Sequence, residues 1–333
     1  MDIIVSHKSA LEYWRLHCNE KINDSAMLVR KNLPANLPNL ATVREAAPSG
    51  LSYPICLMVS SKNAKRKSKI IQTHLYTGPM PKGCFISTGN GIAVISPAFC
   101  FFQMADELPL VKLIELGLEL CGSYSLHVKD EYNPGEESTD KALYGHPHLT
   151  SIKALNAFAS RMEGVCGQKK VSRALRYIAE GSASPMETIL FMLLTLPYKL
   201  GGYGLPAPEL NKRINIGNAT GKRSGKAYYV CDLLWPKANF AIEYDSNFYH
   251  VSADRIAGDA MKRLDLATRG IIVITVTSRQ IRNLIEFEIL AKLIAKKVGR
   301  QLKYKNPQFR AAQLDLRNLL LSSRAGKRDD SGR

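Results

Sequence analysis

The second half of the chain alternates between strand-like and helix-like hydrophobic periods. Three apolar runs predict strands: residues 213–216, residues 226–235 and the run that carries Glu243. A helix with one polar face follows at residues 253–268 and ends at Gly270, as glycine commonly ends helices. Residues 271–276 are a continuous β-branched run, which predicts a buried central strand. The pattern therefore predicts a mixed sheet flanked by helices.

Two Ser-Pro pairs predict where helices begin. Ser96-Pro97 and Ser184-Pro185 each place a capping serine before a proline that suits the first helical turn. Glu187 has the spacing from Ser184 of a capping box, which accounts for this carboxylate without any catalytic role. A metal-directed role is compatible with the same position.

The first half of the chain mixes predicted strands with predicted helices. Its apolar segments predict strands at residues 52–60, 70–76 and 84–88, and the helix after Ser96 is apolar on most sides and so buried. The helix at residues 108–120 has an apolar face, and its Lys112, Glu115 and Glu119 share another, polar face.

These elements predict an α/β chain, α+β overall, in four parts. Residues 1–150 form an α+β N-terminal domain, 151–183 a helical connector, 184–300 a second α/β domain, and 301–333 a basic extension with a disordered end. The helical pair in the connector fits a packing hairpin better than a DNA-reading helix-turn-helix.

Composition narrows the classes of partner. The chain has 333 residues and a net charge of +17, which favours a polyanionic partner such as nucleic acid. Its seven cysteines are scattered singly, so the sequence indicates neither a zinc ribbon nor a disulfide framework. No segment reads as a signal peptide or as a membrane span. We expect a cytoplasmic, nucleoid-associated bacterial protein.

Two acids in predicted strands carry the first functional hypothesis. Asp232 and Glu243 lie in apolar runs joined by a short turn, which brings them to one edge of a sheet. Buried carboxylates are costly unless a partner compensates them, and Mg²⁺ or Mn²⁺ is a suitable partner. The alternative is an ion pair with a Lys or Arg of the helix at residues 253–268.

An ordered series of motifs extends across residues 184–280. It comprises S-P-x-E at Ser184, Pro185 and Glu187; G-L-P-x-P from Gly204 to Pro208; D-L-x-W-P from Asp232 to Pro236; E-x-D at Glu243 and Asp245 with His250 after it; D-x-x-K at Asp259 and Lys262; and V-T-x-R-Q from Val276 to Gln280. In this order the motifs resemble the PD-(D/E)xK restriction-endonuclease-like superfamily. More narrowly, they resemble endonuclease-like domains related to very short patch repair enzymes.

The resemblance implies a Mg²⁺- or Mn²⁺-dependent DNA endonuclease in repair, defence or a mobile element. It implies metal ligation by Asp232 and Glu243 with help from Glu187. The superfamily's usual lysine is replaced by Asp245, as in the narrower family. Lys262 and His250 are therefore both candidates to assist catalysis, as substitute cation and as general base.

The expected partner is double-stranded DNA. The basic residues expected to hold its backbone are Lys222, Arg223, Lys226, Arg263 and Arg279. In the N-terminal half, ISPAFCFFQMA at residues 95–105 and ELCGSY at residues 119–124 resemble abortive-infection antitoxins of the AbiEi type. This resemblance implies an alternative: a non-cleaving, DNA-binding regulator that retains a nuclease fold. A homodimer, and a toxin partner under that alternative, stay open.

Overall fold

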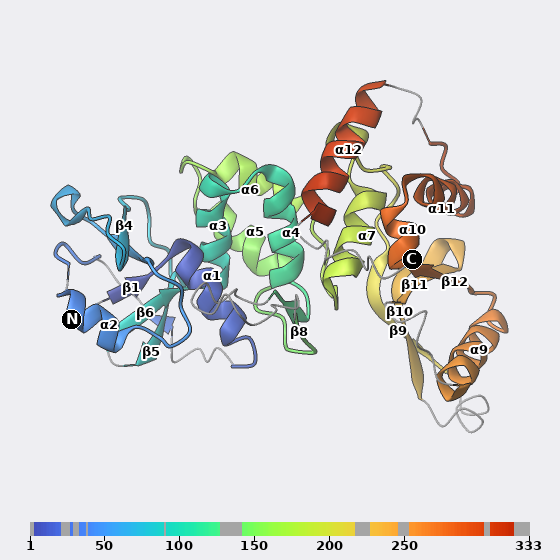
Figure 1. The fold of residues 1–333 in the computed structure, drawn as a ribbon, viewed down its shortest axis with the longest axis horizontal. Coiled ribbons are helices and arrows are strands. Elements are labelled where there is room, and N and C mark those ends of the chain that lie inside the picture. The colour runs from blue at the N-terminus through green and yellow to red at the C-terminus, as the bar shows by residue number, and fades with distance from the viewer. Residues whose placement is uncertain are drawn as a thin grey trace, which may run out of the picture. The chain divides into compact units, whose positions relative to one another are not determined.

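The computed structural model describes residues 3–20, 27–28, 33–37, 39–89, 91–126, 142–216, 227–245, 253–302 and 307–322. The chain divides into two compact units, Met1–Ile178 and Ala179–Arg333. Each unit combines helices with a mixed sheet, so the predicted α+β class is confirmed (Figure 1). None of the helices in the described ranges is long and apolar enough to cross a membrane.

The first unit is built on a six-stranded sheet in the order β2-β5-β6-β1-β3-β4. Its strands are β1 (Ile3–Val5), β2 (Met27–Leu28), β3 (Ile55–Val59), β4 (Ile71–Leu75), β5 (Phe85–Gly89) and β6 (Ile92–Ile95). The pairs β1–β6 and β3–β4 are parallel, and the other neighbours are antiparallel. All residues of β1, β3 and β6 are buried, because these strands carry apolar side chains to both faces.

Helices complete the first unit. They are α1 (His7–Leu16), α2 (Leu40–Ala46), α3 (Pro97–Glu107), α4 (Leu110–Leu120), α5 (Ile152–Ser160) and α6 (Gln168–Leu175), with the short helix η2 (Lys62–Ala64) and the strand pair β7 (Tyr124–Ser125) and β8 (Leu143–Tyr144). Helix α1 packs on β3, β6 and α3, and α3 to α6 gather beside the sheet (Figure 1). The cap of Ser96 on the Phe99 amide confirms the predicted start of α3.

The predicted polar face of α4 is wrong. Glu115 and Glu119 are buried, with 5% and 1% of their surfaces exposed. Arg15 of α1 donates from Nε and Nη2 to the two carboxylate oxygens of Glu119, at 2.7 and 2.8 Å. The Leu126 amide donates to the same carboxylate at 3.0 Å. Helical periodicity alone cannot show that a partner from another helix makes burial of such an acid tolerable.

The second unit contains a four-stranded sheet in the order β12-β11-β10-β9. Its strands are β9 (Glu209–Asn215), β10 (Tyr228–Trp235), β11 (Phe240–Asp245) and β12 (Ile272–Thr277). The pairs β9–β10 and β10–β11 are antiparallel, whereas β11 and β12 are parallel. The helices are α7 (Pro185–Thr195), α9 (Ala253–Ala267), α10 (Ser278–Arg282), α11 (Leu284–Lys297) and α12 (Pro307–Leu321), with the short helices η3 (Tyr198–Leu200) and η4 (Pro236–Ala238). The predicted element order is confirmed.

The prediction of a central strand at residues 271–276 is wrong. Strand β12 is an edge of the sheet and pairs only with β11 among the described strands. Val276 is its one fully buried residue, and Ile272 is 48% exposed. A continuous β-branched run favours strand structure, but it does not determine the strand's place in a sheet.

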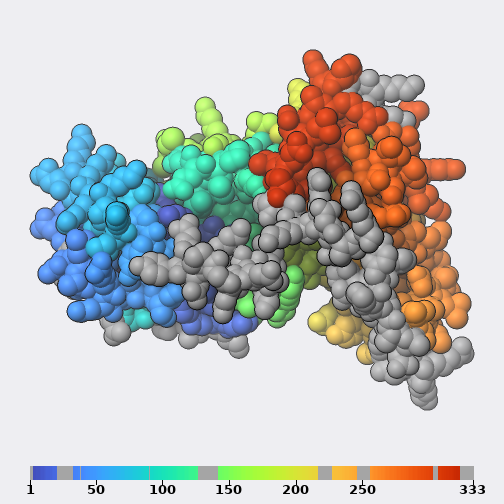
Figure 2. All heavy atoms as spheres, in the orientation of Figure 1, coloured from blue at the N-terminus to red at the C-terminus, as the bar shows by residue number. Residues whose placement is uncertain are grey.

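Helix α12 is an integral part of the second unit. It packs on α7 and η3, and its outer surface appears in red in Figure 2. The Gln313 side chain donates to the Tyr203 hydroxyl at 2.7 Å, and the Arg317 guanidinium donates to the carbonyls of Ile281 and Arg282. Phe309 contacts the rings of Tyr198 and Tyr203. These contacts join the end of the chain to the helices around α7.

Candidate functional site

The sheet of the second unit places three predicted acids near one another. The β10–β11 register pairs Leu233 with Ile242, so Asp232 lies opposite Glu243. Glu187 comes from the first turn of α7, which packs on β10. After burial, the charge of Asp232 is the next largest cause that raises the pKa of each glutamate, so Asp232 acts on both. The sequence prediction that these acids gather at one place is therefore consistent with the structure.

Glu187 makes only half of the predicted capping box, because its carboxylate accepts from the Ala183 amide and not from the amide of the N-cap residue Ser184. Its backbone amide donates to the Ser184 hydroxyl at 3.2 Å. Its Oε2 accepts from the Ala183 amide at 3.0 Å and from the Asn211 side chain at 2.5 Å. The carboxylate therefore caps the helix start and also reaches the sheet, because Asn211 belongs to β9.

Lys262 reaches the acids from α9. Its Nζ donates to Glu243 Oε2 at 2.5 Å and to the Val230 carbonyl at 2.6 Å. Asp232 Oδ2 instead accepts from the Tyr244 amide at 2.7 Å. The structure thus brings Lys262, one of the two candidates to assist catalysis, to the Glu243 carboxylate.

Burial and mutual repulsion perturb the acids. Burial raises the pKa of Glu187 to about 6, with a further contribution from Asp232. Burial, and next the charge of Asp232, raise the pKa of Glu243 to about 7 against the opposing pull of Lys262. The pKa of Asp232 is also raised by burial, although the Tyr244 amide and Lys262 lower it. Lys262 alone does not compensate the three acids.

Asp232 and Glu243 are the residues of this cluster that could hold a divalent cation. Glu243 Oε1 is buried without a hydrogen-bond partner of normal geometry, although the weakly donating Cys231 thiol lowers the pKa of this carboxyl slightly. Carboxylate oxygens are the ligands that Mg²⁺ and Mn²⁺ prefer. Within the described ranges, the oxygens of all three acids do not come within 4.8 Å of one another. Glu187 therefore fits a supporting position better than direct ligation.

The other predicted residues lie at other positions of β11, α9 and α10 or outside the described ranges. Asp245 ends β11 and pairs in register with Thr277 of β12. Arg263 is exposed on α9, and Arg279 is exposed at the start of α10, with an ion pair to Glu286 at 3.4 Å. Outside the described residues lie His250, Lys222, Arg223 and Lys226.

Sequence reasoning missed Asn211. The β9–β10 register pairs Lys212 with Cys231 and Leu210 with Leu233, so Asn211 lies opposite Asp232. Its φ of 47° is left-handed, a conformation that asparagine tolerates better than most residues. This backbone lets the side chain donate to both Glu187 and the Gly181 carbonyl. The only sequence signal for Asn211 was an asparagine in a strand of mixed polar and apolar residues, and this pattern does not indicate a site residue.

Comparison with protein-family models, curated proteins and solved structures finds no match to this chain. The nuclease-like reading therefore rests on the chain's own motifs and on the geometry of its carboxylates.

The raised pKa values of Glu187 and Glu243 predict that the second unit loses stability as pH rises. The folded pKa values of Glu187 and Glu243, about 6 and 7, lie above the ordinary 4.5, so the folded unit binds more protons than the unfolded chain in this window. The stability contributed by these groups is full below pH 4.5 and is lost as pH rises through 6 to 7. We expect a decrease on the order of a few kcal/mol between pH 5.5 and pH 8.

Urea unfolding followed by tryptophan fluorescence measures this decrease. The chain has two tryptophans, and a Trp14→Phe background leaves Trp235 of β10 as the reporter of the second unit. Glu243→Gln should flatten the pH dependence, because it removes the group with the larger shift. Glu209→Gln, which changes a half-exposed strand residue, should leave it unaltered. Equal slopes in the wild type and Glu243→Gln would show that Glu243 does not titrate in this window.

Proposed function

We propose that residues 184–300 form a Mg²⁺- or Mn²⁺-dependent endonuclease that hydrolyses phosphodiester bonds of double-stranded DNA. The observation that carries this proposal is the half-buried acid pair of Asp232 and Glu243, which has one lysine partner and one carboxylate oxygen without a hydrogen-bond partner of normal geometry. Such a pair is costly in the apo protein and is compensated when a divalent cation binds.

The chain's own residues have separate roles in this proposal. Asp232 and Glu243 hold the cation, and Glu187 positions Asn211 beside Asp232. Lys262 carries its ammonium to the acids, where it attracts the scissile phosphate. When bound, the divalent cation lowers the pKa of a water molecule and offsets the charge of the reacting phosphate.

The basic residues are proposed to hold the DNA backbone. Arg263 and Arg279 expose their side chains on α9 and α10, the helices that precede and follow β12. Lys222, Arg223 and Lys226 belong to the segment between β9 and β10 and lie outside the described residues. Each phosphate contact steepens the dependence of binding on salt by about one unit of log–log slope.

The Lys262–Glu243 ion pair favours a second candidate function. An ammonium 2.5 Å from a half-buried carboxylate takes part of the place of a metal ion. A protein of this kind binds DNA with the same fold but does not cleave it, as the AbiEi-type alternative requires. The two candidate functions differ in whether a divalent cation leads to cleavage of the bound DNA.

Cleavage of supercoiled plasmid separates the two functions. The wild type is expected to nick plasmid with Mg²⁺ or Mn²⁺ and to leave it intact with EDTA. Asp232→Asn and Glu243→Gln should each lower the nicking rate by at least about 100-fold, since both keep the side-chain shape but remove a ligand charge. Asp315→Asn is the matched control, because Asp315 is an exposed acid on α12 of the same unit.

The result that contradicts the endonuclease is binding without cleavage. If the wild type shifts DNA in a gel, with or without Mg²⁺, and never nicks it, the non-cleaving regulator is supported instead. Nicking that Asp232→Asn and Glu243→Gln retain would place the cleavage activity outside this carboxylate cluster.

A further inference from the structure

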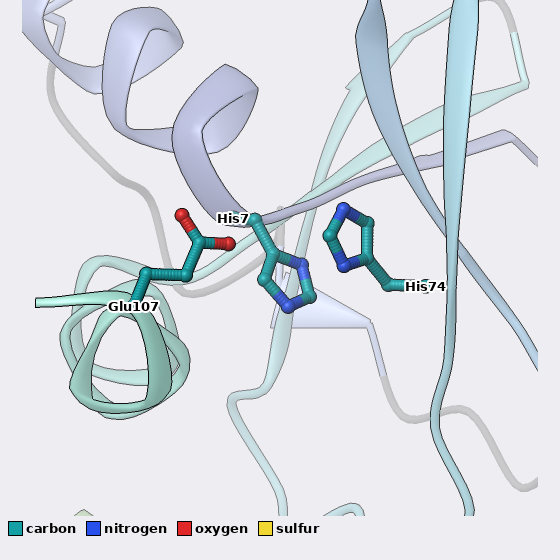
Figure 3. Close-up of side chains that lie close together, drawn as sticks. All are labelled: His7, His74 and Glu107. Atoms are coloured by element: carbon teal, nitrogen blue, oxygen red, sulfur yellow. The ribbon is translucent and has the colours of Figure 1, made fainter. Parts of the chain in front are cut away.

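The first unit contains a second cluster of ligand-type side chains, far from the acids in sequence. His7 begins α1, His74 lies in β4, and Glu107 ends α3. Each of them offers one ligand atom, and these atoms all lie within 4.8 Å of one another. Figure 3 shows the imidazole of His7 between the Glu107 carboxylate and the ring of His74. The fold therefore gathers two imidazoles and a carboxylate from three separate elements.

The backbone fixes His7 in an unusual position. Its φ is 50°, in the left-handed region that few residues other than glycine adopt. Its amide donates to the side-chain oxygen of buried Gln103 at 3.2 Å. A conformation of this kind costs free energy and is frequent at functional sites. The junction between β1 and α1 thus holds the His7 imidazole in its stacked contact with the His74 ring.

The ring nitrogens are arranged for a ligand. His7 Nδ1 lies 3.0 Å from the Ser6 hydroxyl. This hydrogen bond uses Nδ1, so Nε2 is the ring nitrogen that a ligand would meet. A hydrogen bond to one ring nitrogen is the usual way in which proteins orient a metal-binding histidine. His74 Nε2 is buried and has no hydrogen-bond partner. A buried nitrogen without a partner costs free energy that a bound cation relieves.

We propose that His7, His74 and Glu107 form a binding site for a divalent transition-metal ion, with Zn²⁺ as the preferred ion. Two imidazoles and one carboxylate are a ligand set that zinc accepts, with a fourth position left for water or a substrate atom. The nitrogen ligands distinguish the site from the carboxylate-only cluster of the second unit, which suits Mg²⁺ or Mn²⁺.

The side chains have to reorient to bind the ion. Zinc ligands lie about 2.0–2.1 Å from the metal, which sets the ligand atoms of a tetrahedral site ~3.3 Å apart. The rings of His7 and His74 are stacked with centroids 3.6 Å apart and planes 19° apart, so one ring has to turn before both nitrogens can face the same ion. Burial, with the neighbouring His74, lowers the pKa of His7 to about 3, so its ring is already in the neutral form that binds metal. Burial raises the pKa of Glu107, and the charge of Lys8 opposes this rise.

Titration of the full chain with Zn²⁺ tests the proposal. The metal-stripped protein is titrated in competition with a chromophoric chelator, with Mg²⁺ in excess to occupy sites made only of carboxylates. A Cys166→Ser background removes the exposed member of the seven cysteines. The variants are His74→Ala and Glu107→Gln, and His148→Ala is the matched control because it removes an exposed histidine of the same unit.

The wild type and His148→Ala are expected to bind one equivalent of Zn²⁺. His74→Ala and Glu107→Gln should weaken that equivalent at least about tenfold, since loss of a direct ligand costs no less than loss of a supporting residue. Glu107→Gln alters an exposed side chain, so it decides the matter even if His74→Ala does not fold. The proposal is overturned if the wild type binds no equivalent, or if Glu107→Gln binds it as tightly as the wild type.

Discussion

Glu119→Gln is expected to reduce the free energy of unfolding of the first unit by about 3 kcal/mol, because it leaves a largely buried guanidinium without its counter-charge. The Glu119 side chain is 2% exposed, and it accepts both hydrogen bonds of Arg15 and one from the Leu126 amide. The carboxylate thus joins α1, α4 and the end of β7. Arg15 keeps 20% exposure, which places the expected cost at the lower end of the range for buried pairs.

Urea unfolding in a Trp235→Phe background isolates this effect. Trp14 is buried in α1 and donates to the Ile95 carbonyl, so its fluorescence reports the first unit. Glu20→Gln removes an exposed carboxylate that faces His17 and should leave the midpoint within error. The double variant Arg15→Met/Glu119→Leu should be more stable than Glu119→Gln alone, because no buried charge is left unpaired. If Glu119→Gln unfolds at the wild-type midpoint, the ion pair does not stabilise this unit.

Gly201→Ala is expected to destabilise the second unit by at least about 3 kcal/mol, because helix α12 leaves no space for a methyl group. A Cβ on Gly201 would lie 2.2 Å from the Ala312 carbonyl oxygen and 2.8 Å from Leu316 Cβ. The residue also has φ of 87°, which an L side chain rarely adopts. The backbone of α12 would have to move away from η3, and the contacts of Phe309 with the two tyrosines would be lost.

The matched control is another glycine of the same unit. Gly258 lies within α9, and a Cβ there meets no atom within 4 Å, so Gly258→Ala should stabilise the helix by up to about 1 kcal/mol. Fluorescence of Trp235 during urea unfolding measures both variants in the Trp14→Phe background. Equal midpoints for Gly201→Ala and the wild type would show that α12 is not fixed against η3.

Local signals predicted most elements of this fold. The Ser184 cap and the Gly270 end are set by hydrogen bonds and backbone angles within a few residues, so the sequence reveals them directly. The acids at 232 and 243 were also predictable as neighbours, because a short turn between two strands determines their register. These features depend on residues that are close in the chain.

Features that depend on distant residues were missed. The burial of Glu119 requires Arg15, which is 104 positions away. In α11, Ile285 and Ile289 are 74% and 62% exposed, whereas Phe287 and Ala291 are buried. Several faces of that helix are apolar, so periodicity cannot choose among them without the neighbouring elements. The cluster of His7, His74 and Glu107 has no spacing signature for the same reason.

The edge strand β12 has a consequence for handling the protein. Its six residues, Ile272–Thr277, are β-branched, uncharged and free of proline, which is the composition of segments that stack into intermolecular cross-β structure. Arg269 and Arg279 flank the strand, and charges at such positions oppose stacking between chains. Substituting Arg279 to test DNA binding therefore also removes an aggregation guard, so loss of binding has to be measured on material shown to be monodisperse.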